Sequence, residues 1–486
     1  MHGITAYGCY IPRLRLSREA MVAANAWSNA ALRAHRKGER SMCNWDEDPI
    51  TMAVAAARDC LAGSDSAGLG GIFLASTTLP FADRQNAGIV ANALMLPESV
   101  LSMDITASQK AGTSGLVAAL DVVKGRQNGG LLYVAADQRH AKSASVQEMW
   151  YGDGAAALTL GSEGVIARYL GGVSRTVDFV DHYRAADREY DYNWEERWIR
   201  DEGFQKIVPP AVQAVLEQTG TQPGDVRFFA MPCVFSAVPA SIAKKVGLPA
   251  ESVRDTLFAT CGETGTAHAL LLLIDALQEA KPGDKLLVVG FGQGCDALLF
   301  EATDALPAFH ARAGTLGVKG ALANRKEETN YNKFLTFTHQ VTKEFGIRAE
   351  ADVPTPLSAL YRKRDMVFGL MGGRCSACGT AQFPRTDVCV NPECKAVDTQ
   401  EPLSFADRPA HIKTWTADYL TFTLDPPGYY GMVEFEEGGR FMADITDVDG
   451  GQVDVGMPVS MAFRLKSIDE RRGLRRYFWK AVPKAQ

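Results

Sequence analysis

A strand that runs directly into a helix of small residues is the feature of this sequence that most constrains its fold. The pattern predicts a strand over residues 101–105 and a helix over residues 112–122, with small polar residues between them. The turn therefore lies at a helix N-terminus, where backbone N–H groups lack partners within the helix and point toward whatever occupies the turn. Gln109 and Ser108 stand in this turn, which we call the elbow.

The rest of the first 300 residues alternates strand and helix patterns. Before residue 150 the sequence predicts strands at 1–10, 71–76 and 130–136, and helices at 17–34, 50–61 and 86–93. A similar order returns later, with helices at 204–218, 239–246 and 265–280, and strands at 226–231 and 285–290. The alternation indicates an α/β fold with a mixed sheet covered by helices. Its repetition indicates an internal duplication.

Two segments interrupt this alternation. The glycine-rich residues 151–164 are interpreted as a tight turn leading into a core strand. Residues 183–201 are crowded with charges and aromatic rings, which indicates an exposed cap or a dimer contact.

Composition limits the class of protein. A chain of 486 residues with 46% hydrophobic and 22% charged residues has the balance of a globular enzyme of two to four domains. Its net charge of -6 excludes nucleic acid as an expected partner. No apolar run approaches the roughly 20 residues that span a bilayer, so no membrane is expected. The first residues lack the pattern of a signal peptide, and we therefore expect a cytoplasmic protein.

Four of the ten cysteines crowd into one short segment. Cys375 and Cys378 are followed by Cys389 and Cys394, so that two cysteine pairs lie ten residues apart. Four thiolates complete the tetrahedral coordination of Zn²⁺ and leave no open position, which predicts a structural zinc site. Gly379 suits the tight turn that follows the first pair. Because so small a module buries little surface, the metal would contribute folding free energy directly.

The remaining C-terminal sequence has a different character. Two prolines between residues 349 and 360 indicate a linker, placed at 347–366. Short strands at regular spacing follow residue 410, separated by glycine- and proline-rich turns. After a zinc ribbon at 367–400, this pattern predicts a small β-barrel of the OB type at 401–486.

Several motifs together resemble the 3-hydroxy-3-methylglutaryl-CoA synthases of the thiolase superfamily, especially the archaeal type. They are YGCYIPRLRL near the start, NWDEDPITMAV, the elbow QKAGT beginning at Gln109, GFGQGCDALLFEAT and LANRKEETNYNKFLTF. The resemblance covers residues 1–346 and implies a five-layered thiolase fold, an acyl-CoA substrate and a homodimer. Residues 367–486 resemble the rubredoxin-like zinc ribbon and OB-fold proteins that accompany such enzymes as separate subunits, which also makes a thiolase partner possible.

Every catalytic position that the resemblance implies carries a different residue here. The family's cysteine, which becomes acylated, matches Gln109, and its histidine matches Pro232. Its asparagine matches Glu263, and its acid/base glutamate matches Thr77. Glutamine is no counterpart of a thiolate nucleophile, so the acyl-cysteine mechanism cannot be carried over.

The sequence leaves several candidate catalytic residues. The Gln109 amide at the helix N-terminus is a candidate donor to a substrate oxygen, and Glu263 a candidate acid/base or a buried structural carboxylate. His268, on the helix that follows, is a candidate functional residue or a packing residue. Ser108 is a candidate substitute nucleophile. Cys233 and Cys261 are interpreted as core residues, with a position facing the pocket as the alternative for each.

Three functions are compatible with these residues. The first is an enzyme that makes or breaks a carbon–carbon bond beside an acyl-CoA thioester without a cysteine nucleophile, by aldol, retro-aldol or decarboxylation chemistry. The second is a Claisen-type synthase, which requires a nucleophile such as Ser108. The third is a non-catalytic protein that holds acyl-CoA for a thiolase partner.

Overall fold

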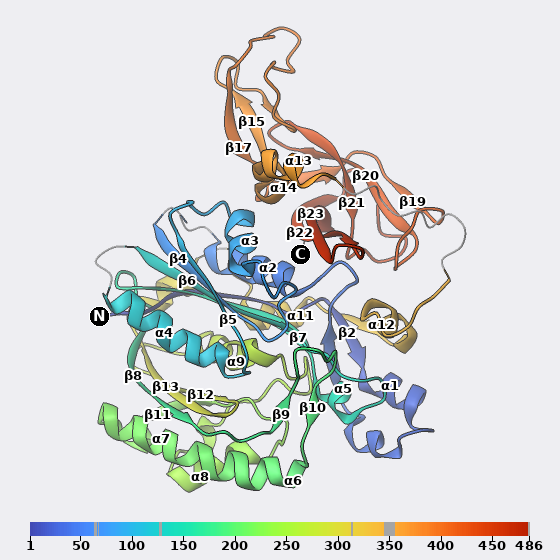
Figure 1. Cartoon of the computed structure of the whole chain (residues 1–486). Coiled ribbons are helices and arrows are strands. Elements are labelled where there is room, and N and C mark those ends of the chain that lie inside the picture. The colour runs from blue at the N-terminus through green and yellow to red at the C-terminus, as the bar shows by residue number, and fades with distance from the viewer. Residues whose placement is uncertain (63–65, 67, 126–128, 313, 345–354, 485–486) are drawn as a thin grey trace. The chain divides into compact units, whose positions relative to one another are not determined.

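The computed structural model describes all residues except 63–65, 67, 126–128, 313, 345–354 and 485–486 (Figure 1). The described chain divides into two compact units, each with most of its contacts within itself. Unit 1 comprises Met1–Cys43, Met52–Gly88 and Pro97–Leu335. Unit 2 comprises Asn44–Thr51, Ile89–Leu96 and Thr336–Gln486.

A mixed sheet forms the centre of unit 1. Its strand order among the described residues is β11-β12-β13-β8-β1-β7-β6-β4-β5. In one half, β4 is parallel to β5 and β6, and β6 is antiparallel to β7; in the other, β11 is parallel to β12, which is antiparallel to β13. This confirms the predicted mixed sheet and the repeated order. The strands are β1 (Gly3–Tyr10), β4 (Leu69–Ala75), β5 (Leu101–Ile105), β6 (Gly130–Gln138), β7 (Asp153–Gly161), β8 (Ala167–Thr176), β11 (Val226–Ala230), β12 (Lys285–Phe291) and β13 (Gly294–Ala302).

Helices of unit 1 lie in layers against the two parts of this sheet (Figure 1). The helices α4 (Ala111–Gly125) and α9 (His268–Leu277) lie between them, and both are mostly buried. On the far side of β8 and β13 pack α7 (Gln205–Thr219) and α8 (Val238–Val246). On the other face, α2 (Pro49–Leu61) approaches β1 so closely that a Cβ at Gly8 would lie 2.1 Å from the Cys60 nitrogen. These layers agree with the five-layered thiolase fold expected from the sequence.

Most boundaries predicted from the sequence hold to within a few residues, but one helix is shorter. The predicted helix 17–34 is α1 (Arg18–Asn25) followed by the 3-10 helix η1 (Ala30–His35). The Asn25 side chain donates to the Met21 carbonyl at 3.0 Å, and the Asn29 side chain accepts from the Ala31 nitrogen at 3.2 Å. Because asparagine side chains compete for backbone groups, they end one helix and begin the next.

The segment rich in charges and aromatic rings forms a hairpin and an irregular helix. The strands β9 (His182–Tyr183) and β10 (Tyr192–Asn193) pair, with His182 opposite Asn193 and Tyr183 opposite Tyr192. They lead into α6 (Glu196–Trp198) and a π-helix over Ile199–Phe204. Successive residues of a strand face opposite sides, so His182 and Asn193 share one face of the hairpin. Tyr183 and Tyr192 share the other face, where they are more than half exposed.

The smaller elements of unit 1 are mostly short. A three-stranded sheet contains β2 (Leu14–Ser17), β3 (Glu39–Met42) and β14 (Lys326–Glu328). Further α-helices between residues 86 and 337 are α3 (Asn86–Ala93), α5 (Val146–Trp150), α10 (Leu306–His310), α11 (Gly317–Ala323) and α12 (Tyr331–Phe337). The sequences of α3 and α12 each cross a boundary between unit 1 and unit 2.

Unit 2 contains a ribbon sheet and a closed barrel. The ribbon consists of β15 (Met371–Cys375), β16 (Ala381–Gln382) and β17 (Gln400–Ser404). The barrel strands run in the order β18-β22-β23-β21-β20, and a pairing between β18 and β20 closes the ring. They are β18 (Ala410–Ile412), β20 (Gly428–Phe435), β21 (Arg440–Ile445), β22 (Pro458–Asp469) and β23 (Leu474–Pro483), with β19 (Thr416–Asp418) beside β20. The predicted zinc ribbon and OB barrel are therefore present.

Part of the predicted linker is helical. Residues 345–354 lie outside the described residues, but α13 (Leu357–Arg362) and α14 (Arg364–Gly369) follow them. The two prolines come before α13, at Pro354 and Pro356, and so do not interrupt it. Proline is compatible with a helix start, so two prolines in this position do not exclude a helix directly after them.

An acidic segment of unit 2 is held by basic residues of the barrel. Asp46 accepts a hydrogen bond of 2.9 Å from Lys480, and both side chains are almost fully buried. Glu47 pairs with Arg464, and Asp48 accepts from the Tyr477 hydroxyl at 2.8 Å. Buried charges require such partners, because an unpaired buried charge is strongly destabilising.

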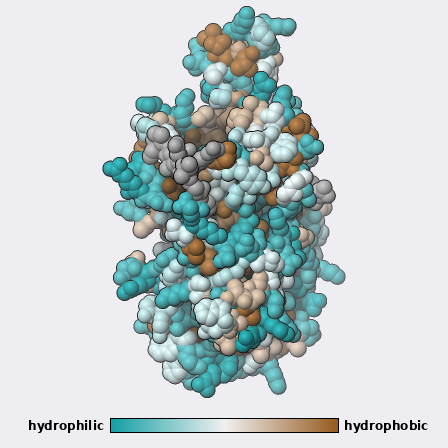
Figure 2. All heavy atoms as spheres, turned by 90° about the vertical axis from the view of Figure 1, so that its right-hand side faces the viewer, coloured by the Kyte–Doolittle hydropathy of each residue, from teal (hydrophilic) through white to brown (hydrophobic). Residues whose placement is uncertain are grey.

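The surface is largely polar on the face that Figure 2 shows. Hydrophobic residues gather there only in small separate groups among hydrophilic ones. Within the described residues, none of the helices combines the length and apolar character required to cross a bilayer.

Candidate active site

The elbow places Gln109 between β5 and α4. The turn begins with Ala107 in the left-handed region, at φ 77°. Ser108 braces it, because its hydroxyl donates to the Gly292 carbonyl at 3.1 Å and accepts from the Lys110 nitrogen at 3.3 Å. Helix α4 then packs so tightly that a Cβ at Gly112 would lie 1.9 Å from the Thr266 oxygen. The small residues predicted after the strand are thus required by the packing of α4.

Glu263 is fixed beside this elbow by its backbone. Its nitrogen donates to the Trp150 carbonyl at 2.8 Å, and its carbonyl accepts from the Gly152 nitrogen at 2.9 Å. The residue is 8% exposed. Its Oε2 accepts from the Gln109 amide at 3.1 Å, and its Oε1 accepts from the Gly265 nitrogen at 2.8 Å. The structure therefore brings together the two residues that the sequence placed at the cysteine and asparagine positions.

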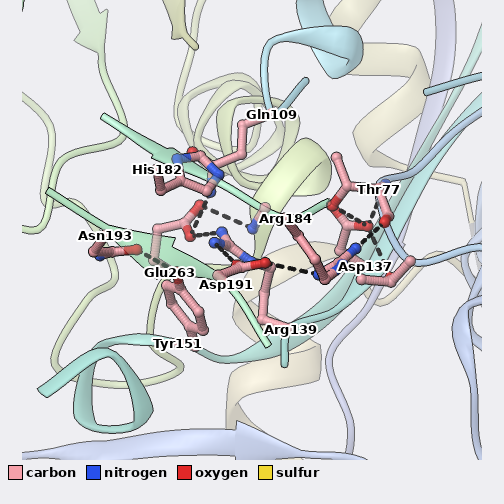
Figure 3. Close-up of polar contacts among 12 residues, drawn as sticks. Thr77, Gln109, Asp137, Arg139, Tyr151, His182, Arg184, Asp191, Asn193 and Glu263 are labelled. Atoms are coloured by element: carbon pink, nitrogen blue, oxygen red, sulfur yellow. Dashed lines mark hydrogen bonds and ion pairs between the residues drawn. The ribbon is translucent and has the colours of Figure 1, made fainter. Parts of the chain in front are cut away.

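A buried arginine completes this cluster (Figure 3). Arg139 follows β6 and forms an ion pair with Glu263. Its second terminal nitrogen donates to Asp191 at 2.9 Å, and its guanidinium lies 3.8 Å from the ring centre of Tyr151. Burial alone would raise the pKa of Asp191, but the positive charges of Arg139 and Arg184 lower it below its ordinary value. One cation thus joins two carboxylates and an aromatic ring in a buried site.

The network continues to the position of the family's glutamate. Arg184 donates to Asp191 at 2.7 Å and also to the Thr77 carbonyl. The Thr77 nitrogen in turn donates to Asp137 at 2.7 Å. Asp137 also accepts from the Thr266 nitrogen at 2.7 Å, and so ties the end of β4 to the turn before α9. Thr77 therefore anchors the hairpin arginine through its backbone.

The hairpin contributes a histidine and its carboxylate partner. The Nδ1 of His182 lies 2.9 Å from Oδ2 of Asp181, which is buried. The other oxygen of Asp181 accepts from the Gln293 amide at 3.3 Å. Across the hairpin, the side-chain oxygen of Asn193 accepts from the Tyr151 hydroxyl at 3.3 Å. Burial raises the pKa of Tyr151 and Arg139 opposes the rise, so Tyr151 stays a protonated hydrogen-bond donor.

These polar groups line one end of a cavity of about 80 Å³. Gln109, Glu263, Arg139, Tyr151, His182 and Asn193 all face it. Aromatic rings also line it. Phe204 stacks on Phe291 with ring centres 4.1 Å apart, and Phe235 packs edge-on against Phe204 and Trp150 at 6.2 and 6.0 Å. A cavity with apolar lining residues and one cluster of convergent polar groups is typical of a small-molecule site.

The other residues predicted for this site lie in different surroundings. Pro232 lines the cavity beside Cys233, and burial raises the pKa of the Cys233 thiol to about 12. The protonated thiol is a weak nucleophile. Cys261 is fully buried and its sulfur contacts the Leu257 carbonyl at 3.4 Å.

His268 is engaged on both ring nitrogens. Its Nδ1 accepts from the Thr264 nitrogen at 3.0 Å, and its Nε2 lies 2.8 Å from the Thr256 carbonyl. Burial lowers the pKa of His268, which is therefore a neutral imidazole that joins two backbone segments. Neither His268 nor Ser108 is among the residues that line the cavity. Their catalytic roles stay predictions, and these contacts favour a structural role for each.

Sequence reasoning missed Arg139, Tyr151, Asn193 and the His182–Asp181 pair. Arg139 directly follows β6, and Tyr151 shortly precedes β7. Both strands were recognised in the sequence, and polar residues at their ends were the available signal. Asn193 lies in the charged segment 183–201 that was interpreted as an exposed cap or a dimer contact, and Asp181 and His182 directly precede that segment. One face of the hairpin is indeed exposed, but the opposite face carries residues of the cavity.

In unit 2, the four cysteines of the ribbon converge. The sulfur atoms of Cys375 and Cys394 are 3.9 Å apart, and those of Cys378 and Cys389 are 3.6 Å apart. All four lie within 4.8 Å of one another. Zinc–sulfur bonds of about 2.3 Å in a tetrahedron give sulfur–sulfur distances of about 3.8 Å, so the donor set fits a zinc ion. Gly379 adopts a φ of 76°, as the predicted tight turn requires.

Family descriptions match three parts of the chain. Residues 216–300 match "3-Oxoacyl-[acyl-carrier-protein (ACP)] synthase III C terminal". Residues 367–398 match "ChsH2, rubredoxin-like zinc ribbon domain", and residues 405–464 match "ChsH2, C-terminal OB-fold domain".

Relatives of the N-terminal part are named hydroxymethylglutaryl-CoA synthase. The protein of that name from Caldivirga maquilingensis is 31% identical over 323 residues, which are 65% of this chain and 92% of the relative. The one from Aeropyrum pernix is 31% identical over 310 residues, which are 63% of this chain and 86% of the relative. A crystal structure described as HMG-CoA synthase complexed with CoA has a TM-score of 0.58 at 15% identity, over 73% of this chain and 95% of that one. At that identity the structural likeness shows a shared fold.

Proposed function

Because the chain belongs to the hydroxymethylglutaryl-CoA synthase family of the thiolase superfamily, we propose that it forms a carbon–carbon bond on an acyl-CoA thioester without an acyl-cysteine intermediate. The synthase direction is preferred over cleavage or decarboxylation, because the relatives carry the name of a synthase. The proposed reaction therefore runs in the synthetic direction, as in the Claisen-type alternative. It uses no cysteine nucleophile, because residue 109 is a glutamine. Aldol cleavage is the same path in reverse.

One observation carries this proposal. The Gln109 amide and the Glu263 carboxylate are hydrogen-bonded to each other in the lining of a cavity that aromatic rings also line. The aromatic lining suits the apolar part of an acyl group, and the polar end suits its thioester carbonyl.

Nothing at the elbow supplies a strong nucleophile. Gln109 has no acidic proton to lose, and the Ser108 hydroxyl is held by the backbone of Gly292 and Lys110. Cys233 lines the cavity but keeps its proton at neutral pH, because burial raises its pKa to about 12. A direct reaction of a thioester enolate with a second carbonyl group requires no such nucleophile.

The test is intact-protein mass spectrometry together with product analysis. The protein is incubated with acetyl-CoA, acetoacetyl-CoA and other short acyl-CoA esters, alone and in pairs. We expect a new carbon–carbon bond in the product and no covalent acyl adduct on the protein. An adduct that disappears in Cys233→Ser or Ser108→Ala would contradict the proposal and establish an acyl-enzyme route.

A non-catalytic role is the second candidate, and one observation favours it. Both oxygens of Glu263 already have partners in Gln109, Gly265 and Arg139, as in a structural carboxylate. A protein of this kind would bind acyl-CoA esters without turnover and would require a thiolase partner. A homodimer is expected for the enzyme from its family, and sedimentation of the purified chain measures it.

In unit 2 we propose a structural Zn²⁺ ion held by Cys375, Cys378, Cys389 and Cys394. The support is the approach of the four sulfur atoms and the match of this segment to a zinc-ribbon description. With four thiolate ligands the ion would have no open position for substrate, so its role is to hold the ribbon together.

A further inference from the structure

A carbon–carbon bond reaction of the proposed kind requires a base that removes a proton from the carbon next to the thioester. The geometry points to His182, oriented by Asp181, as that base. This inference rests on the proposed function and deepens it, because it assigns the proton transfer to a residue outside the positions that the family uses.

Glu263 is poorly arranged for this task. Its Oε1 receives the Gly265 N–H, and its Oε2 receives the Gln109 amide and the Arg139 guanidinium. Donors and a cation directly on a carboxylate stabilise its charge and occupy its lone pairs. Glu263 is therefore suited to positioning Gln109 and Arg139 around the substrate.

His182 has the opposite arrangement. Its Nδ1 lies 2.9 Å from the Asp181 carboxylate, which fixes the proton on that nitrogen and leaves a lone pair on Nε2. Among the described residues, the structure records no hydrogen bond to Nε2, and the side chain is about 15% exposed at the cavity. Imidazole is the side chain whose protonation best suits acid/base work near neutral pH.

Asp181 is itself held in place. It is 7% exposed, and its second oxygen accepts from the Gln293 amide. When His182 gains a proton, the Asp181 carboxylate stabilises the resulting imidazolium and keeps the ring in one orientation. The hairpin register places His182 opposite Asn193, so both reach the cavity from the same face. Figure 3 shows His182 and Asn193 on the same side of the Arg139 network, with Glu263 between them and Arg139.

The proposed step is balanced as follows. Nε2 of His182 takes a proton from the carbon next to the thioester carbonyl, and the electrons of that C–H bond form the enolate, whose charge rests on the thioester oxygen. The enolate carbon attacks the carbonyl carbon of a ketone acceptor. The resulting alkoxide takes the proton back from His182, so the protein returns to its starting state.

The proton transfer can be measured without knowledge of the acceptor. The full-length protein is incubated with acetyl-CoA in D₂O, and deuterium entry into the acetyl group is followed by mass spectrometry. We expect exchange in the unmodified protein and a loss of about 10²- to 10⁴-fold in His182→Gln, the range of general acid–base catalysis. Asp181→Asn should also lose exchange, because the amide no longer favours the required tautomer. Adding imidazole to His182→Ala should restore part of the rate.

Two controls separate the possible failures. His310→Gln changes an exposed histidine outside the cavity and should exchange at the unmodified rate, and equilibrium binding of acetyl-CoA should be retained in His182→Gln. If the unmodified protein neither exchanges nor forms product, the proposed function fails. If it exchanges, and His182→Gln exchanges at the same rate while Glu263→Gln does not, the base is Glu263 and only this inference is overturned.

Discussion

Gln109 and Glu263 lie 154 positions apart in the chain, and the Nε2 of Gln109 donates a hydrogen bond of 3.1 Å to Oε2 of Glu263. At the family's cysteine and asparagine positions, the chain therefore carries two residues that bind each other. The two replacements depend on each other, because either residue without the other would lose this hydrogen bond. An amide donor beside a carboxylate is compatible, whereas a thiolate in the same place would be repelled.

This relationship predicts that Gln109→Cys alone does not restore an acyl-enzyme. The Glu263 carboxylate and its burial both disfavour a thiolate, and Pro232 offers no imidazole to activate the thiol. We expect no acetyl adduct by intact-protein mass spectrometry after incubation with acetyl-CoA. The triple variant Gln109→Cys, Pro232→His and Glu263→Asn should form the adduct. An adduct in the single variant would show that Glu263 does not control this position.

Arg139→Met should be strongly destabilising. The change leaves Glu263 and Asp191 as two buried carboxylates without their shared cation, and breaking a buried ion pair from one side costs about 3–5 kcal/mol. The free energy of unfolding in urea measures the loss. Adding Glu263→Gln to Arg139→Met should recover part of it. Arg184→Met provides the comparison, because Arg184 is more exposed and Asp191 would keep Arg139. Equal losses in Arg139→Met and Arg184→Met would contradict the central role of Arg139.

The sequence was most informative where periodicity and packing decide the structure. Helix α3 has the predicted bounds, Asn86–Ala93, and most strands of the central sheet lie within a few residues of their predicted positions. The spacing of Cys375 to Cys394 predicted the ribbon, because tetrahedral coordination restricts the spacing of the ligands. Gln109 and Glu263 could be paired only through the resemblance to a family, since nothing local to either residue indicates the other.

The cavity residues of the hairpin show where such reasoning fails. Asp191 and Asn193 lie in a run of charges and aromatic rings that has the composition of a solvent-exposed segment. The burial of the Asp191 carboxylate depends on Arg139, which follows a different strand and is 52 positions from Asp191. A pairing of buried charges at that separation leaves no periodic signal in either segment. It follows from the fold, and so becomes visible only when the strands are placed.

Glu148 should make stability depend on pH between its two pKa values. Burial raises the pKa of Glu148 from 4.5 to about 7 in the folded protein, while the Tyr331 hydroxyl and the Ala144 nitrogen donate to its Oε2. The folded state thus binds a proton more tightly than the unfolded state. Stability should therefore fall as pH rises from about 4.5 to about 7, by about 3 kcal/mol at about 1.4 kcal/mol per pH unit.

Glu148→Gln tests this expectation, because the amide oxygen can still accept from Tyr331 and does not titrate. Above pH 7, the free energy of unfolding should change with pH at nearly the same slope in the unmodified protein and in the variant. Between pH 5 and pH 7, only the unmodified protein should lose this contribution. Parallel curves over the whole range would contradict the assigned role of Glu148.

Lys480→Met should destabilise unit 2. Lys480 is 1% exposed, and Asp46, its partner at 2.9 Å, is fully buried. Burial would raise the pKa of Asp46, but Lys480 and Arg464 lower it below its ordinary value. Removing Lys480 leaves a buried charge with less compensation, at a cost of about 3–5 kcal/mol.

The matched control for Lys480→Met is Lys466→Met on the neighbouring strand. Lys466 pairs with Asp444 at 3.0 Å, but both side chains are more than one third exposed, so the loss should be about 0–1 kcal/mol. Asp46→Asn combined with Lys480→Met should recover stability. The unfolding transition measured by circular dichroism in urea distinguishes these variants.

The purified chain should contain one zinc ion, and its loss should unfold the ribbon. The sheet of β15, β16 and β17 is small, so the four thiolate bonds supply folding free energy that its short strands cannot. Elemental analysis should find about one zinc per chain in the unmodified protein and none in Cys389→Ala. Cys233→Ser is the control, because that cysteine is buried in unit 1 outside the cluster, and it should keep the metal. Protease digestion should then cut Cys389→Ala between residues 371 and 404 while unit 1 stays intact. Retention of zinc in Cys389→Ala would rule out the four-cysteine site.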